Sequence, residues 1–272
     1  MAKHLISVRD LKKEDIQELK NLCEDFKRGR RESLEGDVAL FFLESSTRTR
    51  LSFEKACRLL GLRTYYVGNR ESSIEKGESF FDTVKTLSAL GFRALIFRVP
   101  FVLFPYENYL KESISLINAG DGTHQHPTQG LIDLFTALET YGKVENLKVV
   151  FIGDILHSRV FRSSAYLFKL FDARLGVCGP RTLIPSDLSP FGVEEVFDRV
   201  EDASKESYFL QFGLTKERYK ALKGYFMHPG PVNLYVDIDA EVLYSEKSLV
   251  LKQVEMGLYV RMAVLYWALK DG

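Results

Sequence analysis

The heptapeptide Glu-Ser-Ser-Thr-Arg-Thr-Arg at residues 44–50 decides how the first half of this chain folds. It follows an apolar run at 38–43 that predicts a buried strand, and it leads into a helical pattern at 51–56. The first amides of a helix have no partner inside the helix and lie at the positive end of its dipole, so they attract anions. The hydroxyl and guanidinium groups of this stretch add further donors. The pattern therefore predicts a phosphate site; the alternative is an ordinary helix N-cap, which needs only one hydroxyl.

Composition excludes several classes of protein. The chain has 272 residues, and its 37 basic residues are balanced by 37 acidic ones, so no net charge draws it to nucleic acid or to an anionic membrane. No apolar run approaches the roughly 20 residues that span a bilayer, and the N-terminus lacks the apolar core of a signal peptide. We therefore expect a cytoplasmic protein without nucleic-acid or membrane partners, long enough for two domains.

Two side chains of the first half follow predicted strands. Arg98 ends the apolar strand predicted at 94–97, and ligands of open α/β sheets bind where strands end; a solvent-facing strand terminus is the alternative. A strand at 115–118 leads to His126, and Pro127 is typical of the first turn of a helix. A neutral histidine at a helix entrance can donate one hydrogen bond to a carbonyl oxygen.

A second α/β unit begins with the predicted strand at 147–152. Its turn lacks a Gly-x-Gly-x-x-Gly motif, so a nicotinamide or flavin dinucleotide is not expected, and Arg159 places another cation after a strand. The run His-Pro-Gly-Pro at 228–231 is too rigid for a helix, and its backbone carbonyls can hold an amine. No metal is expected, because the histidines at 124 and 126 have no third ligand at a suitable spacing.

These patterns predict the α/β class, with two doubly wound parallel-sheet domains joined by interdomain helices. The predicted domains cover residues 1–141 and 142–248, and the final helix at 249–269 packs back on the first of them.

Four motifs in this order resemble the aspartate and ornithine carbamoyltransferase family over nearly the whole chain. They are the phosphate loop, Lys76 in a polar loop, the strand-end arginine and His-Pro-x-x-Gln at 126–129. Lys-Gly-Glu at 76–78 and His-Pro-Gly-Pro at 228–231 resemble the aspartate branch of that family. The resemblance implies attack of the α-amine of L-aspartate on the carbamoyl carbon of carbamoyl phosphate, with release of phosphate. This is a step of pyrimidine biosynthesis that needs no cofactor or metal.

The resemblance also implies roles for single residues. The phosphate would be held by Ser46, Thr47, Arg48 and Thr49. The carbonyl oxygen would be polarised by Arg98, His126 and Thr49. The carbamoyl amino group would be bound by Gln129 and by the carbonyls of Pro229 and Gly230, and the amino-acid substrate would be contacted by Lys76 and Arg159. Family members are trimers in which the polar loop reaches a neighbouring subunit's site, here through Ser72 and Lys76. Relatives associate with regulatory chains or with dihydroorotase, so a partner of either kind is one expectation.

One element of the family pattern is missing. In the family, an acidic helix after the strand at 176–179 precedes a buried strand ending in Arg-x-Gln, which binds the aspartate carboxylates. Here the acidic segment at 193–203 passes straight to Ser204. Three explanations compete: residues omitted from the sequence, a sheet re-paired with residues 208–212, or a relative with an altered acceptor site. Leu234 also stands where the family usually has an arginine.

Three functions follow from this comparison. The first is carbamoyl transfer to aspartate, and the second is carbamoyl transfer to another amine. The third is a non-catalytic relative that binds carbamoyl phosphate or serves as a structural subunit.

Overall fold

The structure, a computed structural model, describes residues 2–68, 79–103, 105–197 and 213–271. It contains two compact units. One comprises the residues up to Leu131 together with those from Gly257 onwards, and the other comprises Ile132–Met256. The two divisions fall inside helices α4 (Pro127–Tyr141) and α8 (Val250–Leu269). The domain limits at 141 and 248 stay a prediction.

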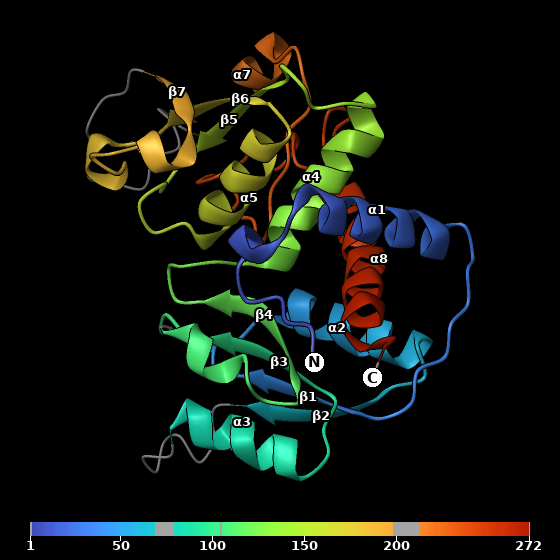
Figure 1. Cartoon of the computed structure of the whole chain (residues 1–272). Helices are drawn as coiled ribbons and strands as arrows, with labels where there is room; N and C mark the ends of the chain where they lie inside the picture. The colour runs from blue at the N-terminus through green and yellow to red at the C-terminus, as the bar shows by residue number, and fades with distance from the viewer. Residues whose placement is uncertain (1, 69–78, 104, 198–212, 272) are drawn as a thin grey trace. The chain divides into compact units, whose positions relative to one another are not determined.

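A four-stranded parallel sheet in the order β2-β1-β3-β4 forms the centre of the first unit (Figure 1). Its strands are β1 (Asp37–Phe42), β2 (Arg63–Gly68), β3 (Ala94–Val99) and β4 (Ser115–Asp121). Its helices, besides the last part of α8, are α1 (Lys13–Lys27), α2 (Thr47–Leu59) and α3 (Phe80–Ala89), with short 3-10 turns at Val8–Asp10 and Tyr106–Tyr109. Strand β4 runs three residues beyond the predicted end, because Asp121 still pairs with Val99 of β3. The strand order confirms the predicted doubly wound topology.

Successive side chains of β1 and β3 point to opposite faces of the sheet, so the buried core of this unit has two parts, one on each face. Ala39, Phe41, Leu95 and Phe97 face one side and pack with Phe80 of α3 in one buried cluster. Figure 1 shows α2 on the opposite face. Because residues of even number in β3 point to that second face, Arg98 lies on the side of α2.

The second unit contains a three-stranded parallel sheet in the order β5-β6-β7. Its strands are β5 (Lys148–Ile152), β6 (Arg174–Cys178) and β7 (Val193–Val196), and its helices include α5 (Arg159–Leu170) and α7 (Lys216–Ala221), with 3-10 turns at Arg181–Leu183 and Ser189–Phe191. Beyond the ends of β5 and β6 the backbones approach so closely that a Cβ on Gly179 would lie 2.1 Å from the Gly153 oxygen. Glycine is therefore required there.

Strand β7 corrects the expectation of an acidic helix in this region. The apolar residues of Val193–Val196 stand three positions apart, a helical spacing, yet this segment pairs with β6 and its burial alternates as in a strand. Cross-strand and helix-to-strand ion pairs add to it: Glu195 lies 2.7 Å from Lys148, and Glu194 lies 2.9 Å from Lys169. The proposed re-pairing with residues 208–212 and the junction at 203–204 lie outside the described residues.

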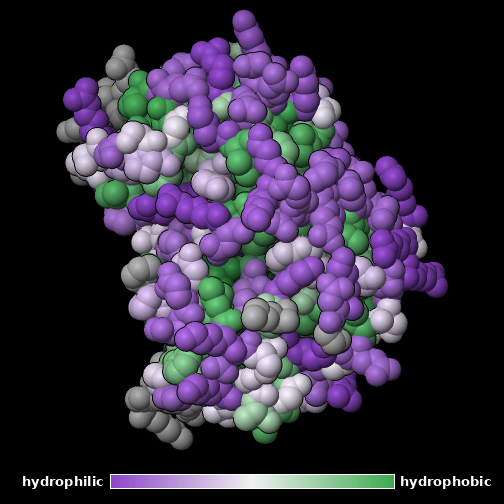
Figure 2. Space-filling model, in the orientation of Figure 1, coloured by the Kyte–Doolittle hydropathy of each residue, from purple (hydrophilic) through white to green (hydrophobic). Residues whose placement is uncertain are grey.

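The surface on the face drawn in Figure 2 is mostly hydrophilic, with apolar residues in separate groups. Among the described residues, no helix has the length and apolar character needed to cross a membrane.

Candidate active site

The strand order of the first sheet reverses between β1 and β3. The chain leaves β1 towards β2 on one side and leaves β3 towards β4 on the other. In open α/β sheets, ligands bind outside the carboxyl ends of the strands at such a reversal. The two strand ends are joined there, because the Leu43 amide donates a hydrogen bond to the Arg98 carbonyl at 2.9 Å. The loop after β1 and the side chain of Arg98 therefore belong to the same edge of the sheet.

The N-terminus of α2 has the features of an anion site. Ser46 is the N-cap residue, but its side chain makes no capping hydrogen bond; its hydroxyl instead lies 2.9 Å from Thr49 Oγ1. The first turn contains no acidic residue. Thr49 is buried, whereas Thr47 and Arg48 are exposed. The N-cap side chain leaves the first amides of this 13-residue helix to a ligand, at the positive end of the dipole.

The two arginines of the heptapeptide differ in their surroundings. The guanidinium carbon of Arg50 lies 4.6 Å from the ring centroid of Tyr66, and its Nε lies 3.6 Å from the Glu54 carboxylate. These contacts assign Arg50 to the packing of α2. The Arg48 guanidinium forms no ion pair within the described part of the chain, which leaves its charge available to an anion.

Arg98 lies between a carboxylate and a backbone carbonyl. Its Nη2 donates to Glu44 Oε1 at 2.7 Å and its Nη1 donates to the Ala119 oxygen at 3.2 Å, and only 12% of its side chain is exposed. A second arginine, Arg261 of α8, is buried with its guanidinium carbon 5.1 Å from the ring centroid of Phe53 in α2. Burial, and then the positive charge of Arg98, lower the pKa of Arg261 to about 9. The guanidinium groups of Arg98 and Arg261 carry two positive charges against the one carboxylate of Glu44 that pairs with Arg98, so the net positive charge here favours an anion.

His126 and Gln129 stand at the entrance of α4, which follows β4. Both side chains are buried. The His126 carbonyl accepts hydrogen bonds from the amides of Gln129, at 2.9 Å, and Gly130, at 3.1 Å. Pro127 is the first residue of the helix, as predicted. Helix α4 therefore starts close after the carboxyl end of β4. The loop at 44–50 and Arg98 lie at the carboxyl ends of β1 and β3, on the same edge of the sheet.

The remaining predicted residues belong to the second unit or lie outside the described residues. Arg159 is the first residue of α5, whose N-cap Ser158 accepts a hydrogen bond from the Phe161 amide at 3.0 Å. Pro229 and Gly230 belong to a loop held by His228, whose amide donates to Gln253 Oε1 at 2.9 Å and whose Nδ1 accepts from the Gly230 amide at 2.9 Å. Ser72 and Lys76 lie in the stretch 69–78, which is not described.

The structure adds three residues that the sequence interpretation missed. Glu44 pairs with Arg98, Arg261 lies close to Arg98, and Asp121 is a buried carboxylate before His126. Each has a weak signal in the sequence: a carboxylate directly after an apolar strand, a single arginine in an apolar helix segment, and an aspartate between two glycines at the end of a buried strand.

Comparison with known proteins agrees with this geometry. The family model "Aspartate/ornithine carbamoyltransferase, carbamoyl-P binding domain" matches residues 3–139, and the "Asp/Orn binding domain" model of the same family matches residues 194–268. The aspartate carbamoyltransferase catalytic subunit of Aquifex aeolicus is 52% identical over 284 aligned positions that cover 96% of this chain and 97% of that protein. This alignment is longer than the chain itself, so part of the relative has no counterpart here.

Solved structures extend the similarity to the whole fold. The catalytic subunit of M. jannaschii aspartate transcarbamoylase is 29% identical with a TM-score of 0.84, and 99% of each chain is covered. The Trypanosoma cruzi aspartate transcarbamoylase in complex with carbamoyl aspartate and phosphate is 25% identical with a TM-score of 0.85, and the match covers 98% of this chain and 96% of that one. The chain described here belongs to the aspartate/ornithine carbamoyltransferase family.

Proposed function

We propose that this chain transfers the carbamoyl group of carbamoyl phosphate to the α-amine of L-aspartate, giving N-carbamoyl-L-aspartate and phosphate for pyrimidine biosynthesis. One observation carries the proposal: the uncapped start of α2, Arg98 and the entrance of α4 all follow the carboxyl ends of strands in one sheet. The relatives support the choice of substrates, because the T. cruzi structure holds carbamoyl aspartate and phosphate, the two products of this reaction.

The phosphate of the substrate binds at the start of α2. The first amides of the helix, the hydroxyls of Ser46, Thr47 and Thr49, and the guanidinium of Arg48 act as donors. A phosphate dianion gains both from these hydrogen bonds and from the dipole. The leaving group is therefore held by a helix that starts directly after the central strand β1.

The carbonyl oxygen of the carbamoyl group is polarised by Arg98, His126 and Thr49. Each donor aimed at the developing oxyanion contributes about 3 kcal/mol to transition-state stabilisation. Gln129 binds the carbamoyl amino group, and the backbone carbonyls of Pro229 and Gly230 accept hydrogen bonds from the same group. Lys76 and Arg159 bind the amino-acid substrate, and Ser72 with Lys76 reaches the site of a neighbouring subunit.

The reaction balances without a protein nucleophile. The lone pair of the α-amine forms a bond to the carbamoyl carbon, and the carbonyl electrons move to oxygen to give a tetrahedral intermediate. The carbon–oxygen bond to phosphate then breaks, and the departing phosphate takes the proton lost by the amine. Holding the amine at attack distance supplies an entropic part of the rate, of a size comparable to the donors.

A homotrimer with shared sites follows from the assignment of Ser72 and Lys76 to a neighbouring subunit's site. This assembly is part of the proposal, as is a cytoplasmic location together with the other enzymes of a biosynthetic pathway. A regulatory chain or dihydroorotase remains the partner class proposed for such a trimer. A gel-filtration mass near that of one 31.2 kDa chain would count against shared sites.

The test is an assay of N-carbamoyl-aspartate formed from carbamoyl phosphate and aspartate. Saturable product that disappears in Arg48→Ala and His126→Ala supports the proposal. The sequence lacks the family's Arg-x-Gln motif, and the Aquifex relative has positions without a counterpart here. Both observations favour a second candidate, a non-catalytic carbamoyl phosphate-binding or structural subunit. That candidate predicts phosphate binding by calorimetry without product, and product with other amines alone would indicate a different acceptor.

A further inference from the structure

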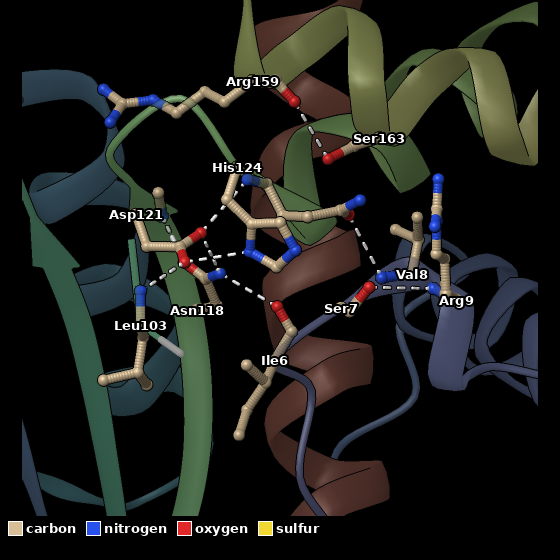
Figure 3. A network of polar contacts seen from close by, with 12 residues as sticks. Ile6, Ser7, Val8, Arg9, Leu103, Asn118, Asp121, His124, Arg159 and Ser163 are labelled. Carbon is tan, nitrogen blue, oxygen red and sulfur yellow. Dashed lines mark hydrogen bonds and ion pairs between the residues drawn. The ribbon is translucent and has the colours of Figure 1, made fainter. Parts of the chain in front are cut away.

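The turn between β4 and α4 is built around a buried carboxylate. Asp121 is the last residue of β4 and is fully buried. Its Oδ2 lies 3.0 Å from the Leu103 amide and 3.0 Å from His124 Nδ1. Its Oδ1 accepts from Asn118 Nδ2 at 2.8 Å and from the Gln125 amide at 3.1 Å. Figure 3 shows Asn118, Leu103 and His124 directed at this carboxylate.

The four partners have a chemical consequence for His124. An ionised carboxylate only accepts hydrogen bonds, so every group around it has to donate. A hydrogen bond from His124 to an ionised carboxylate requires the imidazole proton on Nδ1. The buried charge is therefore fully hydrogen-bonded, as a buried carboxylate must be to avoid a large desolvation cost.

The same turn is closed by its backbone. The His124 amide donates to the Asp121 carbonyl at 2.9 Å, and the Asp121 amide donates to the Gln125 carbonyl at 3.2 Å. Gln125 is held from the other side, because its Oε1 accepts from the Val8 amide at 3.3 Å. His126 is the next residue, so its position is set by the turn before it and by the helix after it.

We propose that Asp121 and His124 are positioning residues for carbamoyl transfer, which fix the turn that carries His126 without touching the phosphate end of the substrate. This inference rests on the proposed function, because it concerns turnover through His126. The phosphate loop at 46–49 belongs to another element, so the two residues affect kcat rather than phosphate affinity.

Asp121→Asn is the sharpest test. Asparagine has nearly the same shape, but it replaces one acceptor oxygen with an NH2 donor, which then faces the Leu103 amide or the Gln125 amide. We expect kcat to fall by about 10²-fold, the loss typical of a catalytic group displaced by about 1 Å. We expect the dissociation constant of inorganic phosphate, measured by calorimetry, to stay within about twofold.

A pair of variants at His124 separates positioning from folding. In His124→Ala the donor to the Asp121 carboxylate is lost, and kcat should fall by at least about tenfold, the effect of one hydrogen bond to a charged group. In His124→Asn the carboxamide NH2 can replace Nδ1–H, and kcat should recover to within about twofold of the unchanged protein. Leu19→Ala, a buried change on α1, is the matched control: it lowers stability and leaves kcat in place.

A readout without turnover keeps this inference distinct from the proposed function. Hydrogen exchange of the Gln125 amide should speed up at least about tenfold in Asp121→Asn relative to Leu19→Ala at equal global stability. Unchanged exchange, or a kcat within about twofold of the unchanged protein in Asp121→Asn, overturns the inference. If the unchanged protein forms no N-carbamoyl-aspartate, the proposed function fails, whereas the exchange measurement still decides whether Asp121 fixes the turn.

Discussion

Replacing Arg98 by methionine separates the catalytic role of its guanidinium from its structural role. Methionine keeps an unbranched apolar side chain in a site where 12% of the arginine side chain is exposed. The variant loses the ion pair with Glu44 and the hydrogen bond to the buried Ala119 carbonyl. Because 34% of the Glu44 side chain is exposed, its carboxylate remains hydrated. The main cost is the unmade bond at the carbonyl, about 1–3 kcal/mol, reduced by the relief of repulsion with Arg261.

The expected catalytic loss is larger than the loss of stability. One donor removed from a developing oxyanion costs about 2.7–4 kcal/mol, or roughly 10²–10³-fold in kcat. The measurements are kcat and KM for carbamoyl phosphate in a colorimetric assay of N-carbamoyl-aspartate, and the free energy of unfolding in urea.

Arg50→Met is the matched control for this experiment. It removes a guanidinium six residues from Glu44 in sequence, but the contacts of Arg50 with Tyr66 and Glu54 assign it to packing. We expect kcat close to that of the unchanged protein in this variant. A kcat for Arg98→Met within about fivefold of the Arg50→Met value would refute the role of Arg98 at the carbonyl.

Three further predictions concern the same unit. Thr49→Val removes the hydroxyl 2.9 Å from Ser46 Oγ, and we expect phosphate affinity by calorimetry to fall by about tenfold, the effect of one hydrogen bond to a charged group; an unchanged affinity contradicts the phosphate site. Burial lowers the pKa of His4, whose Nδ1 accepts from the Leu116 amide at 3.2 Å, so its neutral form is favoured in the folded state. This contribution to stability is complete above the unfolded pKa of about 6.5 and is lost as the pH falls below that value. His4→Gln should therefore reduce the decrease in the free energy of unfolding in urea between about pH 7.5 and pH 5. An equally large decrease in both proteins would argue against this account. Burial raises the pKa of the Cys57 thiol to about 12, so we expect Cys57 to resist an aromatic disulfide reagent at pH 8 until urea unfolds the chain. Detection by mass spectrometry of Cys57 labelled before unfolding would contradict this prediction.

Local patterns allowed much of the fold to be predicted. The apolar run before residue 44 forms β1, and the final helix, predicted at 249–269, spans Val250–Leu269. Such elements depend on the hydrophobic period of neighbouring residues. The acidic helix expected from the family resemblance was wrong for Val193–Val196, because this segment pairs as β7 with β6, which lies some twenty residues earlier in the chain.

The sequence by itself determined the succession of strand, hydroxyl-rich turn and helix around residues 44–50, because these elements are contiguous and the free amides at a helix start arise from local backbone geometry. Only the tertiary structure decided which groups surround it. Arg261 lies close to Arg98 although 163 positions separate them in the sequence, and Leu103 and Asn118 meet at the Asp121 carboxylate. These contacts depend on how strands and helices far apart in the sequence pack. The charged groups that make them lose their water only when the core has formed.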